Sequence, residues 1–172
     1  MRILISLLVF QAGWFASVLG AAYELTPVGI ALALVATVVN ISLLNHRFQQ
    51  ILAVIAIILL GLLMDSLLIA FDVFAPNQAL PITWLAPPWL LMMWANFGAM
   101  INNALTWLHK RWFLQSVFGF VGGPAAYYGG KALGAITFPE DTLISLSIMA
   151  VAWAVVTPIC FEIARRAESH SS

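Results

Sequence analysis

Six long apolar stretches, separated by short polar or turn-forming breaks, constrain this sequence more than any other feature. They cover residues 3–22, 27–44, 51–73, 88–108, 112–136 and 143–163. About 20 apolar residues in a helix suffice to cross the hydrocarbon core of a bilayer. Only 8% of the 172 residues are charged, whereas a soluble domain carries about 25%. The pattern predicts an all-α fold: a polytopic membrane helix bundle of six transmembrane helices, with residues 1–172 as a single integral membrane domain.

The basic residues alternate between the breaks. Six of them fall at the N-terminus, near the second and fourth breaks, and at the C-terminus: Arg2, Arg47, Lys110, Arg111, Arg165 and Arg166. The first, third and fifth breaks contain neither Lys nor Arg. Because Lys and Arg accumulate in cytoplasmic loops, this alternation predicts that both termini are cytoplasmic.

The first apolar stretch also has the pattern of a cleaved signal peptide. Arg2, an apolar run and the small residues Gly20 and Ala22 match the three parts of such a peptide. Gln11 and Trp14 inside the run, together with its full spanning length, favour a retained helix instead. Cleavage would leave five spans, so the two interpretations differ in the number of helices.

Charged residues inside the stretches are candidates for function, because an Asp at a helix centre costs about 2.5–3.5 kcal/mol on insertion scales. Asp65 lies in the third stretch, on one helical face with Gly61 and Asp72. Lys131, in the fifth stretch, is the one basic residue away from a predicted cytoplasmic boundary. Two arrangements are open. In one, Lys131 forms a buried charge pair with Asp65 or Asp72; in the other, Lys131 snorkels to the headgroups and Asp65 is protonated and hydrogen-bonded.

Counting depth along each helix at about 1.5 Å per residue groups the polar residues into two layers. The outer layer supplies the candidate binding residues, which are Asp65, Asn96, Tyr127, Tyr128 and Lys131. The inner layer consists of amides, which are Gln11, Asn40, Asn102, Asn103 and Gln115. Amides between membrane helices commonly bond neighbouring helices, so we expect packing contacts there in preference to ligand contacts.

The fifth stretch contains the most unusual local sequence, GFVGGPAAYYGGKALG at residues 119–134. Pro124 removes a helical hydrogen bond, which predicts either a kinked packing helix or a broken one. A broken helix would free backbone groups toward a cavity, as in many transporters. The pairs Gly119/Gly123 and Gly130/Gly134 predict close approach of another helix.

Catalytic, metal and nucleic-acid motifs are missing. The three histidines fall in loops or the tail, and Cys160 is the single cysteine, so we expect no metal site, no cofactor and no catalytic constellation. The net charge of zero argues against nucleic acid. The expected partners are the lipid bilayer and either another membrane protein or a second copy of this chain.

Four segments carry a resemblance to a known family. They are FQAGWFA at 10–16, GLLMDSL at 61–67, PWL at 88–90 and GGPAAY at 122–127. Together they resemble an uncharacterised family of small Gram-negative inner-membrane proteins, catalogued as a domain of unknown function. The resemblance covers nearly the whole chain. It implies multi-pass location in the bacterial inner (cytoplasmic) membrane and a link to membrane-lipid metabolism, and it supplies no activity.

Three function classes fit these features. The lack of catalytic motifs and the short loops favour a non-catalytic accessory or scaffold subunit. A polar site between the third, fourth and fifth helices would instead suit a small transporter or binding protein for an amphipathic molecule. In the third class, an intramembrane lipid-modifying enzyme, Asp65 would act as acid or base. A wet cavity beside Asp65 and Tyr127 would favour transport or catalysis, and a dry core would favour the scaffold.

Overall fold

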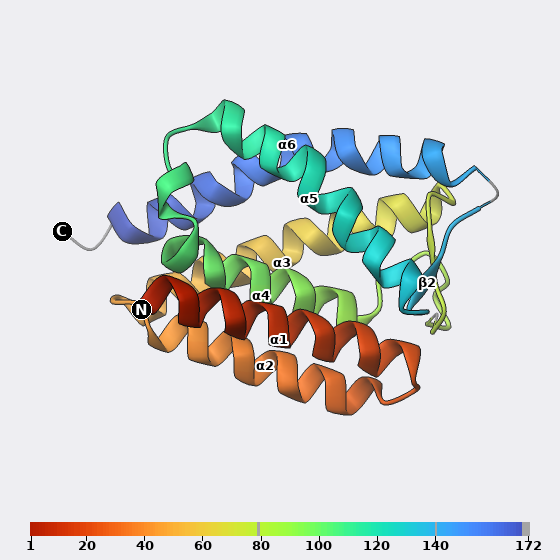
Figure 1. Ribbon diagram of the computed structural model, residues 1–172, viewed down its shortest axis with the longest axis horizontal. Helices are drawn as coiled ribbons and strands as arrows, with labels where there is room; N and C mark the ends of the chain where they lie inside the picture. The colour runs from red at the N-terminus through yellow and green to blue at the C-terminus, as the bar shows by residue number, and fades with distance from the viewer. Residues whose placement is uncertain (79, 140, 170–172) are drawn as a thin grey trace.

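The computed structural model describes residues 1–78, 80–139 and 141–169, and the regular elements of this part of the chain are helices and one short strand pair. The helices are α1 (Arg2–Ala22), α2 (Thr26–Ser42), α3 (Arg47–Ala70), α4 (Pro88–Ala104), α5 (Trp112–Ala132) and α6 (Thr142–Ser169) (Figure 1). A single 3-10 turn, η1 (Thr106–Leu108), follows α4. The strands β1 (Ala75–Pro76) and β2 (Ile136–Thr137) pair antiparallel. The predicted all-α class is therefore confirmed, and each of the six apolar stretches forms a helix.

Within the described residues, three helices are long and apolar enough to cross a membrane by length and composition. They are α1, α3 and the Thr142–Glu168 part of α6. α2 is apolar but has 17 residues, and α4 also has 17. The large apolar side chains on the outside of the bundle, such as Leu8, Leu59 and Val155, are exposed. Extended apolar surface of this kind marks contact with a membrane or with another protein.

The ends of α3 and α5 fall earlier than the apolar pattern predicts, because the backbone turns left-handed there. Gly134 has φ +86°, and the N–H of Ala135 donates to the carbonyl of Gly130 at 2.9 Å. This is the Schellman arrangement that closes a helix. Asp72, with φ +53°, has the same place after α3, although it carries a side chain. The apolar residues beyond these points belong to the loops and to β2.

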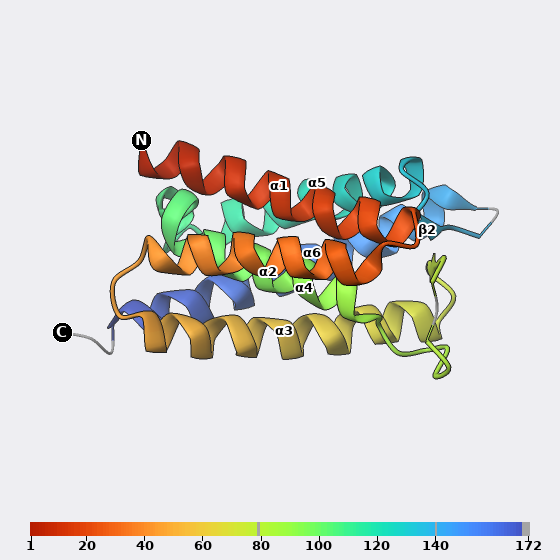
Figure 2. The ribbon, with the colours of Figure 1, turned by 90° about the horizontal axis from the view of Figure 1, so that it is seen from below.

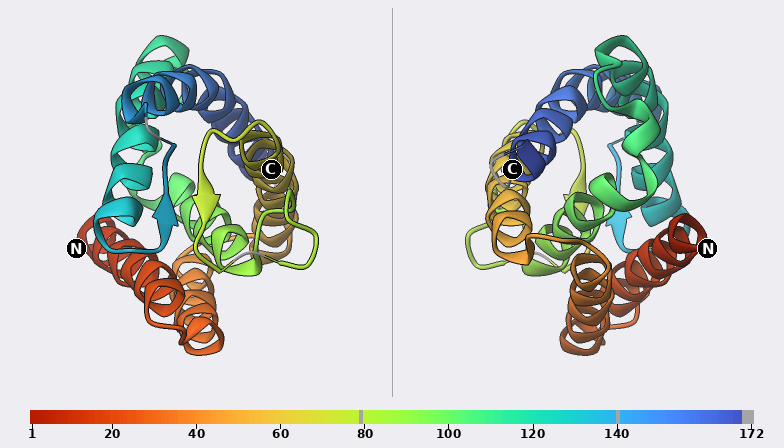
Figure 3. Two further views of the ribbon diagram at one scale, coloured as in Figure 1. Left: turned by 90° about the vertical axis from the view of Figure 1, so that its right-hand side faces the viewer. Right: turned by 90° about the vertical axis from the view of Figure 1, so that its left-hand side faces the viewer.

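α4 is the central helix of the bundle. Every residue from Trp94 to Ala104 is buried. α1 and α2 pack on one side of it, and α3 and α6 pack on the other (Figure 3). α5 packs on α6 and lies farther from the centre. Because its neighbours cover α4, this helix needs no continuous lipid-facing surface.

Four of the five amides of the inner layer bond neighbouring elements, and they are Asn40, Asn102, Asn103 and Gln115. The fifth, Gln11, is exposed on α1, so the expected packing contact is not found there among the described residues. The Nδ2 atom of Asn102 donates to Oε1 of Gln50 at 2.9 Å and to a carbonyl of α6 at 2.8 Å. Asn103 donates to the backbone carbonyl of Asn40 at 2.7 Å. Gln115 donates to the carbonyl at the end of η1 at 2.9 Å. The predicted packing role is confirmed for these amides. Gln50, which was not predicted to belong to this layer, is part of it because it accepts from Asn102.

The helices run side by side along the long axis of the molecule (Figure 2), and the start of α1 lies at the same end as the last turns of α6 (Figure 1). The α2–α3 and α4–α5 connections lie at that end as well. Six of the 7 Lys and Arg residues are therefore at one end, and Lys131 is at the other. The alternation of charge along the sequence becomes a difference between the two ends of the bundle.

Candidate functional site

Asp65 is fully buried and joins three helices. Its Oδ2 atom accepts a hydrogen bond from Nε1 of Trp94 on α4 at 2.8 Å. Its Oδ1 atom accepts a hydrogen bond from the hydroxyl of Tyr127 on α5. Gly61, one turn before Asp65, leaves the space for the indole, since a Cβ at Gly61 would lie 2.2 Å from the Trp94 ring. The indole of Trp94 therefore packs against the face of α3 that carries Gly61 and Asp65.

A second indole extends this cluster toward α6. Trp153 stacks on Trp94 with the ring centroids 4.6 Å apart and the planes at 7°. A Cβ at Gly123 would lie 2.1 Å from the Trp153 ring, and one at Gly119 would lie 2.2 Å from Oγ1 of Thr157. The predicted close approach at Gly119 and Gly123 is confirmed, and it lets α5 pack directly against α6.

The other features predicted for α5 turn out differently. α5 is helical from Trp112 to Ala132, including Pro124, so the broken-helix alternative is wrong. The nearest atoms to a Cβ at Gly130 or Gly134 lie 3.7 Å and 4.0 Å away. This second glycine pair makes ordinary contacts, because Gly134 ends the helix instead of packing against another one.

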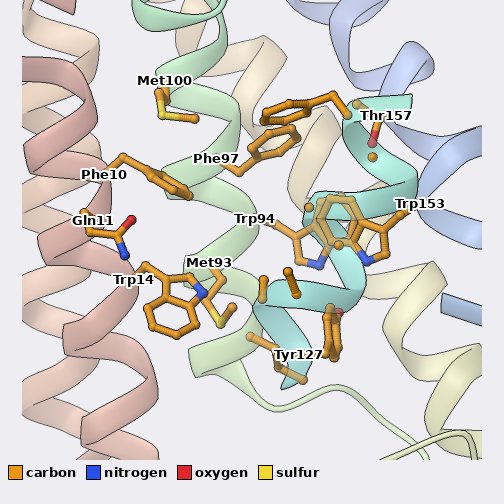
Figure 4. A pocket seen from close by; sticks show the side chains of 17 residues that line it. Phe10, Gln11, Trp14, Met93, Trp94, Phe97, Met100, Tyr127, Trp153 and Thr157 are labelled. Carbon is orange, nitrogen blue, oxygen red and sulfur yellow. The ribbon is translucent and has the colours of Figure 1, made fainter. Parts of the chain in front are cut away.

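Aromatic side chains line a cavity of about 350 Å³ between α1, α4, α5 and α6 (Figure 4). They include Phe10 and Trp14 from α1, Phe97 from α4, Phe118 from α5 and Trp153 from α6. Trp94 and Tyr127 also line it, so the Asp65 cluster supports its wall. Among the residues that the structure describes, no Lys, Arg, His, Asp or Glu lines this cavity. The cavity is apolar and carries a few polar atoms.

The cavity opens between α1 and α5. Its lining residues on α4 and α6 are buried or half-buried, whereas Gln11 on α1 and Gly122 and Ala125 on α5 are exposed. A Cβ at Gly122 would meet no atom within 4 Å. At the end of the opening that lies farther from the chain termini, Trp14 of α1 approaches α5 closely, because a Cβ at Gly129 would lie 3.1 Å from its ring. The opening therefore lies on the side of the bundle.

The structure brings together two of the five candidate binding residues. Asp65 and Tyr127 are hydrogen-bonded. Asn96 is buried on another face of α4, where its Nδ2 atom donates to the carbonyl of Phe10 at 2.7 Å. Tyr128 is 55% exposed and points outward. Lys131 is also exposed and lies apart from Asp65. Of the five, Tyr127 alone lines the cavity.

Lys131 pairs with neither aspartate. Its Nζ atom donates to Oγ1 of Thr142 at 3.0 Å and lies 5.4 Å from the centre of the Phe138 ring. Glu162 forms ion pairs with two arginines of its own helix, Arg165 and Arg166. The charge-pair alternative is therefore wrong, and Asp65 is hydrogen-bonded as the other arrangement expects. Asp72 follows the end of α3 and is exposed.

The cavity was not predicted from the sequence, although the positions of three tryptophans in the sequence indicate it. Trp14, Trp94 and Trp153 lie in the middle of their apolar stretches, whereas interfacial tryptophans lie at the ends of spans. An indole N–H in the middle of a span finds no partner in lipid. Tryptophans at that depth therefore indicate a polar partner or a cavity inside the protein.

Comparison with known proteins identifies a family and nothing closer. No curated protein and no solved structure matches this chain. The family model described as "Protein of unknown function (DUF2878)" matches residues 3–159. That range includes Asp65 and every lining residue of the cavity, from Phe10 to Thr157. The chain belongs to the DUF2878 family of proteins of unknown function.

Proposed function

We propose that this protein is a bacterial inner-membrane protein that binds the apolar part of an amphipathic molecule in the cavity between α1, α4, α5 and α6. One observation carries the proposal, namely an apolar cavity that opens on the side of the bundle, which is the side that would face lipid if the helices cross a membrane. Its volume of about 350 Å³ is within the range of ligand pockets, about 300–1,000 Å³. A molecule dissolved in the bilayer reaches such an opening without crossing water.

The proposal includes six membrane-crossing helices with both termini cytoplasmic. The basic end of the bundle supports this orientation. Cys160 is fully buried, so its replacement by Ala gives a background for single-cysteine labelling. A cysteine at Glu24 should react with a membrane-impermeant maleimide in spheroplasts, and one at Lys110 should react only after permeabilisation. The reverse pattern would refute this orientation.

The cavity distinguishes this function from the other two classes. A scaffold subunit needs interhelical bonds, which the inner amides supply, but it needs no lateral opening. An enzyme that used Asp65 as acid or base would need its carboxylate at the ligand. Both oxygens of Asp65 are engaged by Trp94 and Tyr127, and Asp65 lies behind the lining. Binding without chemistry at Asp65 fits this geometry best.

A pair of neighbouring substitutions on α5 tests the proposal. Gly122→Trp places an indole at the opening of the cavity, where a Cβ meets no atom within 4 Å. Val121→Trp places the same side chain on the outer surface, where Val121 is 61% exposed. Both proteins should fold, which circular dichroism in detergent checks. Lipid extraction and native mass spectrometry should show that Gly122→Trp loses a bound molecule that wild type and Val121→Trp retain. Equal retention by both variants would contradict the proposed function.

A further inference from the structure

We infer that a second cavity, at the basic end of the bundle, binds the phosphate headgroup of an anionic phospholipid. The cavity lies where the α4–α5 connection meets the last turns of α6, and it shares no described lining residue with the aromatic cavity between α1, α4, α5 and α6. The inference uses the membrane orientation proposed above, and it does not depend on which molecule the aromatic cavity holds. It is supported by the size of the second cavity, by its charge and by the tryptophans at its depth.

The second cavity has a volume of about 360 Å³, which is within the range of ligand pockets, about 300–1,000 Å³. Its buried and half-buried lining residues are His109, Gln115, Pro158 and Phe161. The rings of His109 and Phe161 pack edge to face, with their centroids 5.9 Å apart. Gln115 donates to the carbonyl of Leu108 at 2.9 Å. These contacts hold the α4–α5 connection against α6, so fixed side chains form the cavity.

The charged residues that line this cavity are Lys110, Glu162 and Arg165. Glu162 pairs with Arg165 at 2.7 Å and with Arg166 at 2.8 Å, so two cations already share its carboxylate. Arg165 uses Nε and Nη2 for this pair, which leaves Nη1 to donate to another acceptor. Lys110 is exposed, and its ammonium group makes no hydrogen bond or ion pair with a described residue. The cavity therefore offers positively charged donors, while its carboxylate is already paired.

Positive charge also predominates around the cavity. The segments that meet there, residues 109–115 and 158–168, contain four basic residues (Lys110, Arg111, Arg165 and Arg166) and two acidic ones (Glu162 and Glu168). The first turn of α5 adds to this field, because its N–H groups have no acceptor within the helix and no side chain caps them. A phosphate is an acceptor that forms strong charge-assisted hydrogen bonds with Lys and Arg. The local chemistry therefore matches a phosphate.

Two tryptophans indicate that the cavity lies at the level of lipid headgroups. Trp112 lines the cavity and is 71% exposed, and Trp107 in η1 is 57% exposed. Exposed indoles accumulate at the interfaces of a membrane, and basic pockets between helices on the cytoplasmic side bind lipid headgroups. Phe113 and Val117, farther along α5, are exposed apolar side chains that acyl chains would contact. We therefore take a lipid, in preference to the free ion, as the source of the phosphate.

The test measures the Tm of the full chain in neutral detergent micelles while a probe is added, since a ligand that binds the folded state raises its Tm. Dioleoylphosphatidylglycerol is the anionic lipid. Dioleoylphosphatidylcholine has the phosphate without net charge, and dioleoylglycerol has the acyl chains without phosphate. Inorganic phosphate has no chains. The four probes separate the contributions of charge, phosphate and acyl chains.

Two adjacent residues of one loop supply a matched pair of variants. Lys110→Gln removes a positive charge from the lining of the cavity. Arg111→Gln removes the same charge from the next residue, which does not line the cavity. Both side chains are exposed, so both variants should fold, which far-ultraviolet circular dichroism checks.

We expect phosphatidylglycerol to bind wild type more tightly than phosphatidylcholine or inorganic phosphate does. Lys110→Gln should weaken the binding of phosphatidylglycerol about threefold to tenfold, the effect of one hydrogen bond. The same variant should leave the binding of dioleoylglycerol unchanged, because that lipid has no phosphate. Arg111→Gln should bind phosphatidylglycerol nearly as tightly as wild type does.

Several results would overturn the inference. Equal losses in Lys110→Gln and Arg111→Gln would show that the charge of the loop, and not the cavity, attracts the lipid. Phosphatidylglycerol binding that Lys110→Gln leaves unchanged would exclude the cavity as well. If phosphatidylcholine binds as tightly as phosphatidylglycerol, the site does not select an anion; if inorganic phosphate does, the source is not a lipid. The proposed function is tested separately, by the bound molecule that Gly122→Trp should lose.

Discussion

Alanine substitutions at two neighbouring glycines of α5 should have opposite effects on stability. At Gly123, a Cβ would lie 2.1 Å from Cγ of Trp153 and 2.4 Å from its Cδ1. The ring cannot easily move aside, because it stacks on Trp94 at 4.6 Å. At Gly122, a Cβ would meet nothing within 4 Å. The same chemical change is therefore a clash at one position and harmless at the next.

The magnitudes follow from two contributions. In a helix, replacing Gly by Ala stabilises by about 0.5–1 kcal/mol; this gain applies at both positions and cancels in their difference. Overpacking a core costs about 1–3 kcal/mol and applies at Gly123 alone. The free energy of unfolding of Gly122→Ala should therefore exceed that of Gly123→Ala by about 1–3 kcal/mol, and Gly122→Ala should equal or exceed wild type.

Unfolding by SDS in mixed micelles, followed by far-ultraviolet circular dichroism, measures both variants against wild type. Near-ultraviolet circular dichroism supplies a second readout, because displacement of the stacked indoles should change the spectrum of Gly123→Ala only. Equal stabilities, or a less stable Gly122→Ala, would refute the assigned faces of α5 and with them the position of the cavity.

Four further substitutions test the buried contacts. Tyr127→Phe and Asp65→Asn should each lower the free energy of unfolding by about 1–3 kcal/mol, because each leaves a buried partner unpaired. The double variant should lose less stability than the sum of the two single losses. Strict additivity in an SDS titration would contradict the hydrogen bond between Tyr127 and Asp65. Gly61→Ala brings a Cβ to 2.2 Å from the Trp94 ring and should alter the near-ultraviolet circular dichroism. An unchanged spectrum would contradict the packing of Trp94 against Gly61. Asn102→Leu removes two interhelical bonds and should cost about 0.6–2 kcal/mol for each; a wild-type SDS midpoint would contradict that role.

The positions of the helices could be predicted because each one contains an apolar run of nearly spanning length, and such a run is visible without knowledge of its neighbours. The helix ends were harder to predict. Asp72 takes a left-handed conformation that residues with a side chain rarely adopt. An aspartate at this position therefore does not indicate the end of α3, whereas a glycine such as Gly134 does indicate the end of α5. The apolar residues that follow extend the pattern beyond the true end in both cases.

The depth of the candidate site residues along the helices could be predicted, but the direction in which each side chain points could not. Counting residues places Asp65, Tyr127 and Tyr128 at similar heights, yet adjacent residues of a helix point about 100° apart. Tyr127 therefore reaches Asp65, while Tyr128 faces outward. Nothing in the local sequence selects between them, because the choice depends on which face of α5 meets α3 and α6. The same ambiguity hid the difference between Gly122 and Gly123.

The position of Asp65 follows from what a cavity in a membrane protein requires. Lipid outside is as apolar as the side chains inside, so no hydrophobic force separates the two, and helices associate through packing and polar bonds. A bundle that leaves about 350 Å³ unfilled loses packing contacts between α1 and α5. The bonds from Asp65 to Trp94 and Tyr127 fix two lining residues from outside the cavity. We therefore expect Asp65→Asn to weaken retention of the bound molecule as well as stability, whereas Asn102→Leu, at a residue that does not line the cavity, should lower stability alone.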